Sequence, residues 1–319
     1  MKNENFQSAL NKEGAIHIAL QPPELLFLST YPPRECGIAT YTQDLVIALK
    51  NKFNQSFKLS ICSLESDNEK HVYPAEVKYI LDTDQADGFA RTARSINADA
   101  AISLVLIQHE FGLFRKNEAD LQEFIATIKK PVIIAFHTVL PNAEAAMKTN
   151  VQQLATLASS LIVMTRNSAN ILVNEYAIPS EKIMVIPHGT HLVPHTSKEL
   201  LKKKHGLTGR RVLSTFGLLN SGKNIEMTLA ALPRIVQEYP DVTFLVIGKT
   251  HPSVVKSEGE IYRQKLEAIV KELQLSFHVK FINYFLPLPE LLEYLQLTDI
   301  YLFTSKDLNQ AVSGRFPTR

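Results

Sequence analysis

The chain has 319 residues, of which 45% are hydrophobic and 21% are charged, and its formal net charge is +2. This composition is typical of a globular protein of about two domains, and it excludes a disordered chain or one that binds polyanions through its overall charge. The two cysteines, Cys36 and Cys62, exclude a disulfide framework, and neither stands in a metal-binding spacing.

Residues 1–24 are predicted to be a short leader before the first domain. Met1 to Gln21 lack the basic start and the clean apolar stretch of a signal peptide. No apolar run in the sequence approaches the roughly 18 residues that a membrane span needs. We therefore expect a cytoplasmic protein.

Residues 25–195 are predicted to form a first domain, because short apolar strands alternate there with helical patterns. Continuous apolar strands fit a parallel sheet that is covered on both faces. The expected strands are Leu25–Ser29, Phe57–Ser63, Val77–Ile80, Ile102–Ile107, Val132–Phe136, Leu161–Met164 and Ile183–Ile186. The expected helices between them include Ala39–Lys50, Asp84–Ile96, Glu118–Lys129 and Glu144–Ser159.

Residues 196–319 are predicted to form part of a second domain of the same kind. Its basic opening, Ser197–His205, carries the run Lys202, Lys203 and Lys204 and is interpreted as a solvated helix face; a membrane-surface patch is the alternative, for which a run of three lysines is short. The expected strands are Arg211–Phe216, Val242–Ile247, Val279–Ile282 and Ile300–Thr304, and the expected helices are Ile225–Tyr239, Glu258–Leu273 and Pro289–Leu297. The predicted fold class is therefore α/β, with two tandem Rossmann-like, doubly wound parallel sheets, the second of them incomplete.

The loop after the first strand is the first candidate for a site, because ligands of open parallel sheets bind beyond the carboxyl ends of the strands. It contains two prolines and Gly37, and a helix is expected from about Ile38. The free N–H groups of that helix start would favour an anion such as a phosphate. The loop matches neither the dinucleotide fingerprint nor the Walker phosphate loop, and a plain strand-to-helix turn is the structural alternative.

Two histidines follow neighbouring strands of the first domain. His109 and Glu110 come at the end of the fourth strand, and His137 comes at the end of the fifth, so we expect the two histidines at equivalent positions. A single histidine at a strand end is more often structural, but two of them beside a carboxylate favour a site. Imidazoles placed there could hydrogen-bond sugar hydroxyls or an acceptor.

In the second domain, Gly217 and Lys223 frame the loop after the first strand. Glycine lets the backbone approach a ligand closely. Lys223 stands before a helix, where its charge opposes the helix dipole, and an anion such as a diphosphate between them would explain it; an exposed lysine in a turn is the alternative. The next loop, Gly248–Pro252, either lines the same site or simply turns the chain.

In this order, these residues resemble the GT-B family of retaining glycosyltransferases often called group 1 or family 4. The resemblance extends over about Leu25 to Gly314, and its most specific segments are Ser29–Thr40, Ile183–Thr190, Thr215–Lys223 and Leu229–Pro233. It implies two Rossmann-like domains that face each other across a cleft. The first would bind the acceptor and the second a nucleotide-activated sugar, with no metal ion and no other cofactor.

The resemblance also implies roles for single residues. Gly37 matches the glycine near the donor phosphates, His137 the histidine against the transferred sugar, and Lys223 the cation on the diphosphate. The full set of expected site residues is His137, His109 and Glu110 as catalytic candidates, Gly37, Gly217, Asn220 and Lys223 for the donor, and Arg34 and Glu35 for the acceptor.

The chain departs from the family pattern at two places. Leu218 stands where many members have an arginine that binds the donor phosphates, and Lys249 or Arg34 would have to compensate. Asn309 or Gln310 occupies the region of the first of two family glutamates, and the tail Arg315–Arg319 does not continue a helical pattern. We therefore expect a truncated second domain with impaired activity and an exposed sheet that favours self-association.

The leading prediction for function is transfer of a hexose, with retention, from a nucleotide sugar to a glycan or a lipid-linked acceptor, as in carbohydrate biosynthesis. The runner-up is a non-catalytic protein that binds nucleotide sugars or glycans. A sugar-nucleotide epimerase fits the loop around Lys223 less well, and a nicotinamide oxidoreductase lacks its fingerprint. No nucleic-acid partner is expected, and peripheral membrane association stays open.

Overall fold

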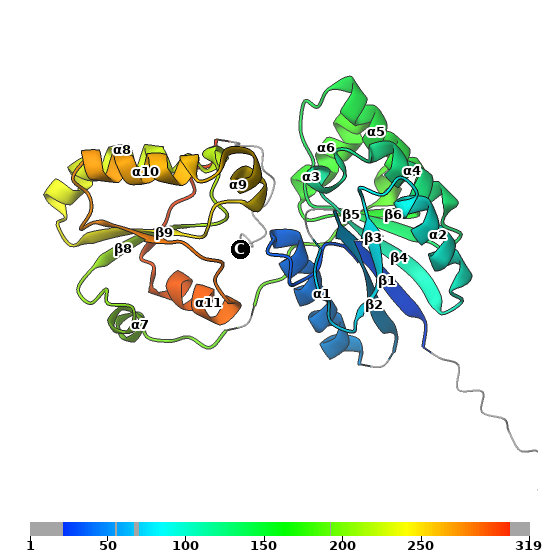
Figure 1. The fold of residues 1–319 in the computed structure, drawn as a ribbon, viewed down its shortest axis with the longest axis horizontal. Helices are drawn as coiled ribbons and strands as arrows, with labels where there is room; N and C mark the ends of the chain where they lie inside the picture. Colours follow the sequence, from blue (N-terminus) through cyan, green and yellow to red (C-terminus); the bar gives the residue numbers. More distant parts are fainter. Residues whose placement is uncertain (1–21, 55, 67–69, 192, 307–319) are drawn as a thin grey trace, which may run out of the picture. The chain divides into compact units, whose positions relative to one another are not determined.

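The computed structural model describes residues 22–54, 56–66, 70–191 and 193–306, and within them the chain divides between Pro187 and His188 into two compact units. Both units are parallel α/β sheets, as predicted (Figure 1).

The first unit contains a seven-stranded parallel sheet with the strand order β3-β2-β1-β4-β5-β6-β7. The strands are β1 (Glu24–Ser29), β2 (Lys58–Glu65), β3 (Val77–Asp82), β4 (Ile102–His109), β5 (Val132–Phe136), β6 (Ser160–Val163) and β7 (Ile183–Val185). The helices are α1 (Gly37–Phe53), α2 (Gly88–Ala98), α3 (Phe111–Phe114), α4 (Glu118–Thr127), α5 (Ala145–Leu157) and α6 (Arg166–Tyr176), with a 3-10 turn, η1 (Ser180–Lys182).

Alternating side chains of β1 show how this sheet is covered on both faces. Leu26 and Leu28 pack in a core with residues of α2, α4, α5 and α6, whereas Phe27 packs in a second core with Val46 of α1. Successive residues of a strand point to opposite faces, and all three of these β1 side chains are fully buried, so both faces of the sheet are covered. The sheet is therefore doubly wound around β1, which also places the loop after β1 at its centre.

The second unit contains a four-stranded parallel sheet with the strand order β10-β9-β8-β11. Its strands are β8 (Arg211–Phe216), β9 (Val242–Ile247), β10 (Val279–Ile282) and β11 (Ile300–Tyr301). Its helices are α7 (Lys198–Lys204), α8 (Ile225–Glu238), α9 (Pro252–Glu258), α10 (Ile261–Glu272) and α11 (Leu288–Leu297), with a 3-10 turn, η2 (Ser221–Lys223). Figure 1 shows α8 and α10 on one face of this sheet and α7 and α11 on the other, and the two cores of the unit agree with that arrangement.

The basic run at the start of the second unit forms the helix α7, and a helix was predicted there. Lys202 and Lys198 of α7 bind Asp299, at 2.6 and 3.1 Å, and Lys204 binds Glu293 of α11 at 2.7 Å. Three of these cations therefore hold α7 to the end of α11 and the start of β11, which supports a structural role for the run.

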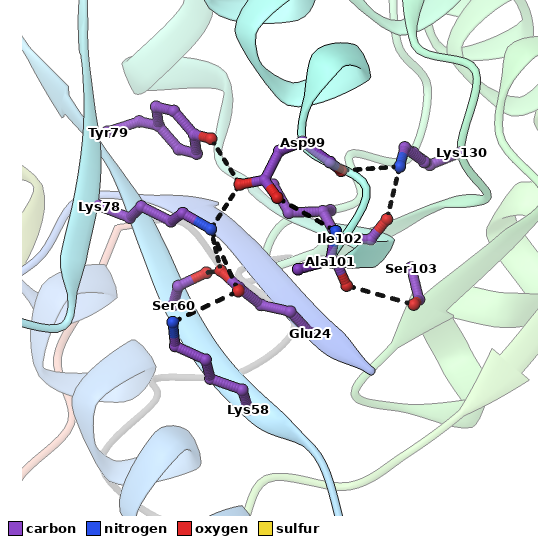
Figure 2. Close-up of polar contacts among 10 residues, drawn as sticks. All are labelled: Glu24, Lys58, Ser60, Lys78, Tyr79, Asp99, Ala101, Ile102, Ser103 and Lys130. Atoms are coloured by element: carbon purple, nitrogen blue, oxygen red, sulfur yellow. Dashed lines mark hydrogen bonds and ion pairs between the residues drawn. The ribbon is translucent and has the colours of Figure 1, made fainter. Parts of the chain in front are cut away.

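A polar cluster closes the amino-terminal edge of the first sheet, opposite the edge where ligands are expected (Figure 2). Glu24 is fully buried there and accepts hydrogen bonds from Ser60 Oγ and from Lys78 Nζ at 2.9 Å, and Lys78 also binds Asp99. Burial alone would raise the pKa of Glu24, but the bonds from Ser60 and Lys78 and the charges of Lys78 and Lys58 hold it below its usual value. Removing one partner of such a buried pair strongly destabilises a fold, so we assign this cluster to stability.

Candidate functional site

The loop after β1 is fastened to α1 by short side chains. Ser29 Oγ lies 2.6 Å from Thr42 Oγ1, and Thr30 Oγ1 lies 3.2 Å from Cys36 Sγ. Cys36 precedes α1 and accepts a hydrogen bond from the Ala39 amide at 3.4 Å, which satisfies one of the orphan donors of the helix start. The loop is thus ordered by the sheet and by its own helix.

The predicted site residues of this loop lie toward solvent. Glu35 and Gly37 are exposed, and Arg34 is half-buried with its amide bonded to the Tyr31 carbonyl at 3.1 Å. A Cβ built at Gly37 would meet no atom within 4 Å, so folding does not require glycine there. A backbone that a ligand approaches closely would require it.

The carboxyl ends of β4 and β5 correct one expectation about the two histidines. In the register of the sheet His109 lies opposite Phe136, so His137 lies opposite Glu110, one position farther along. Because side chains alternate between faces, this offset places His109 on one face and His137 on the other. The prediction that the two histidines occupy equivalent positions is therefore wrong.

His109 lies among aromatic side chains on its face of the sheet. Only 2% of its surface is exposed, and its ring stacks on Phe114 at 5.4 Å and tilts against Phe136 at 4.8 Å. Burial lowers the pKa of His109 to about 3, so the ring is neutral at physiological pH. In this structure its role in a site would be indirect, through packing.

His137 lies on the other face, in contact with side chains from β4 and α1. Its Nε2 is 2.7 Å from Gln108 Oε1 of β4, and the Tyr41 ring of α1 meets the imidazole edge-on at a centroid distance of 4.7 Å. Beside it, Thr138 donates a hydrogen bond to Glu110 at 2.8 Å, while burial raises the pKa of Glu110. Among the predicted residues of this unit, Glu110 and His137 both follow directly on their strands, and the side-chain contact of Glu110 is with Thr138.

Sequence reasoning did not find Gln108, Tyr41 or Thr138. Thr138 stands next to His137, and Gln108 is a polar residue at the end of an otherwise apolar strand, which was a usable signal. Tyr41 comes from the helix after β1, and nothing in the sequence links it to the end of β5.

In the second unit two glycines bring the loops after β8 and β9 into contact. Gly217 and Gly248 have positive φ angles of 145° and 123°, which side-chain-bearing residues rarely adopt. A Cβ on Gly248 would lie 2.2 Å from the Gly217 carbonyl oxygen. Leu219 and Thr250 then form a parallel bridge, so the two loops run side by side at one edge of the sheet. This supports the first of the two alternatives for Gly248–Pro252.

Lys223 ends the short turn η2 and precedes the start of α8. The Lys223 amide donates to the Asn220 carbonyl at 3.0 Å, and its carbonyl accepts from Thr304 Oγ1 at 2.8 Å. The neighbouring Gly222 carbonyl accepts from the Lys306 amide at 2.9 Å. The backbone of the lysine-bearing turn is therefore held between α8 and the residues after β11, close to the amino-terminal pole of the α8 dipole.

Arg263 is a buried cation that stabilises the contact between the loops of Gly217 and Gly248. Arg263 of α10 is 3% exposed and donates a hydrogen bond from Nη2 to the Gly248 carbonyl at 2.9 Å. Glu260 lies 3.4 Å from Arg263 Nε and also accepts a hydrogen bond from Thr250. This group links α10 to the loop after β9, and no sequence motif pointed to it.

The remaining predictions fall partly outside the described residues. Asn309, Gln310 and the tail Arg315–Arg319 lie there. Leu218, which the sequence resemblance aligns with a family arginine, is buried at 9% exposure. In the part of the chain that the structure describes, none of the helices combines the length and the apolar composition of a membrane span.

Comparison with known proteins supports the resemblance inferred from sequence. Residues 197–314 match the model of the family described as glycosyl transferases group 1. A search among curated proteins gives no match.

Solved structures share the fold at low sequence identity. HepE from Anabaena, crystallised with UDP and glucose, has a TM-score of 0.65 at 16% identity over 89% of this chain and 74% of its own. Sucrose-phosphate synthase from Thermosynechococcus elongatus has a TM-score of 0.63 at 13% identity, over 89% and 75% of the two chains. A glycosyltransferase from Rickettsia africae has a TM-score of 0.62 at 14% identity, over 89% and 73%. The predicted GT-B fold is confirmed.

Proposed function

We propose that this chain, with its GT-B fold and a second unit that matches group 1 glycosyl transferases, transfers a hexose with retention from a nucleotide sugar to a glycan or lipid-linked acceptor. The observation that carries the proposal is the coincidence of the family match with the paired glycine loops and Lys223 at one edge of the second sheet. Such an edge is where open parallel sheets bind nucleotides.

The donor side of the reaction belongs to the second unit in this proposal. Lys223 binds the diphosphate. Gly217 allows the donor to approach the backbone closely, and Asn220 supplies a polar side chain. HepE is crystallised with UDP and with UDP-glucose, which makes UDP-glucose the first donor to test here. A cation beside the diphosphate stabilises the negative charge that develops on it as it leaves, which lowers the barrier without a metal ion.

The first unit handles the acceptor and the transferred sugar. Arg34, Glu35 and Gly37 lie on the loop after β1, and His137 hydrogen-bonds the sugar, with Glu110 nearby. The acceptor oxygen attacks the anomeric carbon as the bond to the phosphate oxygen breaks, and the leaving phosphate takes the acceptor proton on the same face of the sugar. The protein contributes mainly by positioning and by charge stabilisation, unlike the two-carboxylate hydrolysis of glycosidases.

A non-catalytic role in binding nucleotide sugars is the second candidate, and the buried Leu218 favours it. An apolar side chain at that position leaves the diphosphate with one cation fewer than in many group 1 members. Binding without turnover would be the outcome that selects this candidate.

A thermal-shift screen tests whether the chain binds a nucleotide sugar. We expect one nucleotide sugar of a panel led by UDP-glucose to raise the melting temperature by several degrees at about 100 times its Kd, because binding to the folded state then adds about 2.7 kcal/mol. Free glucose at the same concentration is the control and should have no effect. A panel in which no nucleotide sugar raises the melting temperature would remove the donor site from the proposal.

A further inference from the structure

Gln108 has a buried side-chain amide whose hydrogen-bonding capacity is only partly satisfied. Its side chain is fully buried, and its amide nitrogen has no hydrogen-bond partner among the described residues. An unpaired buried donor is destabilising, and an aliphatic side chain of the same shape would avoid that cost. The contact that Gln108 does make is with His137, and a role at His137 explains why an amide stands here.

The imidazole of His137 is held on several sides. Gln108 Oε1 lies 2.7 Å from its Nε2, and the Tyr41 ring packs edge-on against it. Its backbone amide donates to the His109 carbonyl at 3.0 Å, which fixes the Cα position at the end of β5. Just beyond the ends of the two strands, Thr138 donates a hydrogen bond to Glu110. The ring therefore has a defined orientation at the edge of the sheet.

The partner atom on Gln108 determines which ring nitrogen carries the proton. An amide carbonyl oxygen only accepts hydrogen bonds, so a neutral imidazole paired with it must carry its proton on Nε2. The other nitrogen, Nδ1, then has a lone pair and accepts. In histidines generally, the hydrogen bond made by one nitrogen fixes the chemistry of the other.

We propose that Gln108 is a positioning residue that holds His137 in the Nε2–H tautomer, so that Nδ1 accepts a hydrogen bond from a hydroxyl of the transferred sugar. This inference rests on the proposed function for its ligand, because it assigns to the sugar a donating hydroxyl. Gln108 itself touches no substrate. It acts through the ring of His137.

The tautomer can be measured without turnover. In the full chain labelled with ¹⁵N-histidine, long-range ¹H–¹⁵N spectra at about pH 8.5, two units above the ordinary imidazole pKa, distinguish the two neutral forms. We expect the Nε2–H pattern for His137, whose signals are assigned from their loss in His137→Ala. A predominant Nδ1–H pattern in the wild-type chain would overturn the inference, whatever the activity of the protein.

Variants separate positioning from a general structural role. Gln108→Met keeps the length of the side chain without an acceptor, and we expect it to release the tautomer preference of His137 and to lower kcat by about tenfold, the loss of one hydrogen bond. In a His137→Ala background the same change should lower kcat no further. An equal loss in both backgrounds would contradict the positioning role. An Nε2–H wild-type spectrum in a chain that shows no turnover would instead contradict the proposed function.

Discussion

Replacing Lys223 by alanine should weaken binding of the nucleotide-sugar donor about 100-fold, equivalent to roughly 2.8 kcal/mol, without unfolding the second unit. The lysine stands in η2, immediately before the positive pole of the α8 dipole, where a cation is unfavourable unless an anion lies beside it. A charge-assisted bond to a diphosphate oxygen is worth that much in a partly buried site. Calorimetric titration with the donor measures the change directly.

Lys203→Ala is the matched control for this experiment. Lys203 is an exposed lysine on α7 of the same unit, so its removal changes the net charge equally but leaves the loop after β8 untouched. Its Kd should stay within about twofold of the wild-type value, because exposed charges are screened by salt. Equal losses in the two variants would indicate a general charge effect, and an unchanged Kd in Lys223→Ala would remove the diphosphate role.

Replacing Gly248 by alanine should destabilise the second unit by about 3 kcal/mol or more and abolish donor binding. The new Cβ would lie 2.2 Å from the Gly217 carbonyl oxygen, and alanine would also have to adopt a φ of 123°. Neither backbone can retreat easily, because the Gly217 amide bonds to Ile247 and Arg263 bonds the Gly248 carbonyl. The two loops would have to separate, which breaks the edge at which Lys223 lies.

Denaturant unfolding of Gly248→Ala beside Gly189→Ala tests this prediction. A Cβ at Gly189 would meet no atom within 4 Å, so that variant should unfold at nearly the wild-type denaturant concentration. If Gly248→Ala unfolded at the same midpoint as Gly189→Ala, the close approach of the two loops would not be a property of the folded protein.

The strands were predictable because their signal is local. Val132–Phe136, Arg211–Phe216, Val242–Ile247 and Val279–Ile282 have the predicted bounds, since a run of buried apolar residues ends where polar loop residues begin. Helix α6 was not among the predicted helices. It is amphipathic, but its start depends on Thr165 accepting a bond from the Ser168 amide and its end on Ala177 in a left-handed conformation.

The candidate site was predictable only in part, because register between strands is not encoded locally. The rule about strand ends selected His137, Glu110, Gly217 and Lys223 correctly as residues of the carboxyl edges. It could not show that His109 is offset by one position and turns to the opposite face. Nor could it find Arg263, which reaches the loop after β9 from a helix fifteen residues farther along the chain.

The measurement that tests the central claim most directly is release of the nucleotide from the donor, followed with the configuration of the sugar. The full chain is incubated with UDP-glucose, or with whichever nucleotide sugar stabilises it most, so that water serves as the acceptor. Early ¹H spectra then report which anomer of the sugar is formed. We predict slow release of the nucleotide diphosphate with the α-anomer of glucose as first product, and no release in Lys223→Ala. Tight binding of the donor with no release above the Lys223→Ala background would contradict glycosyl transfer and select a binding protein instead.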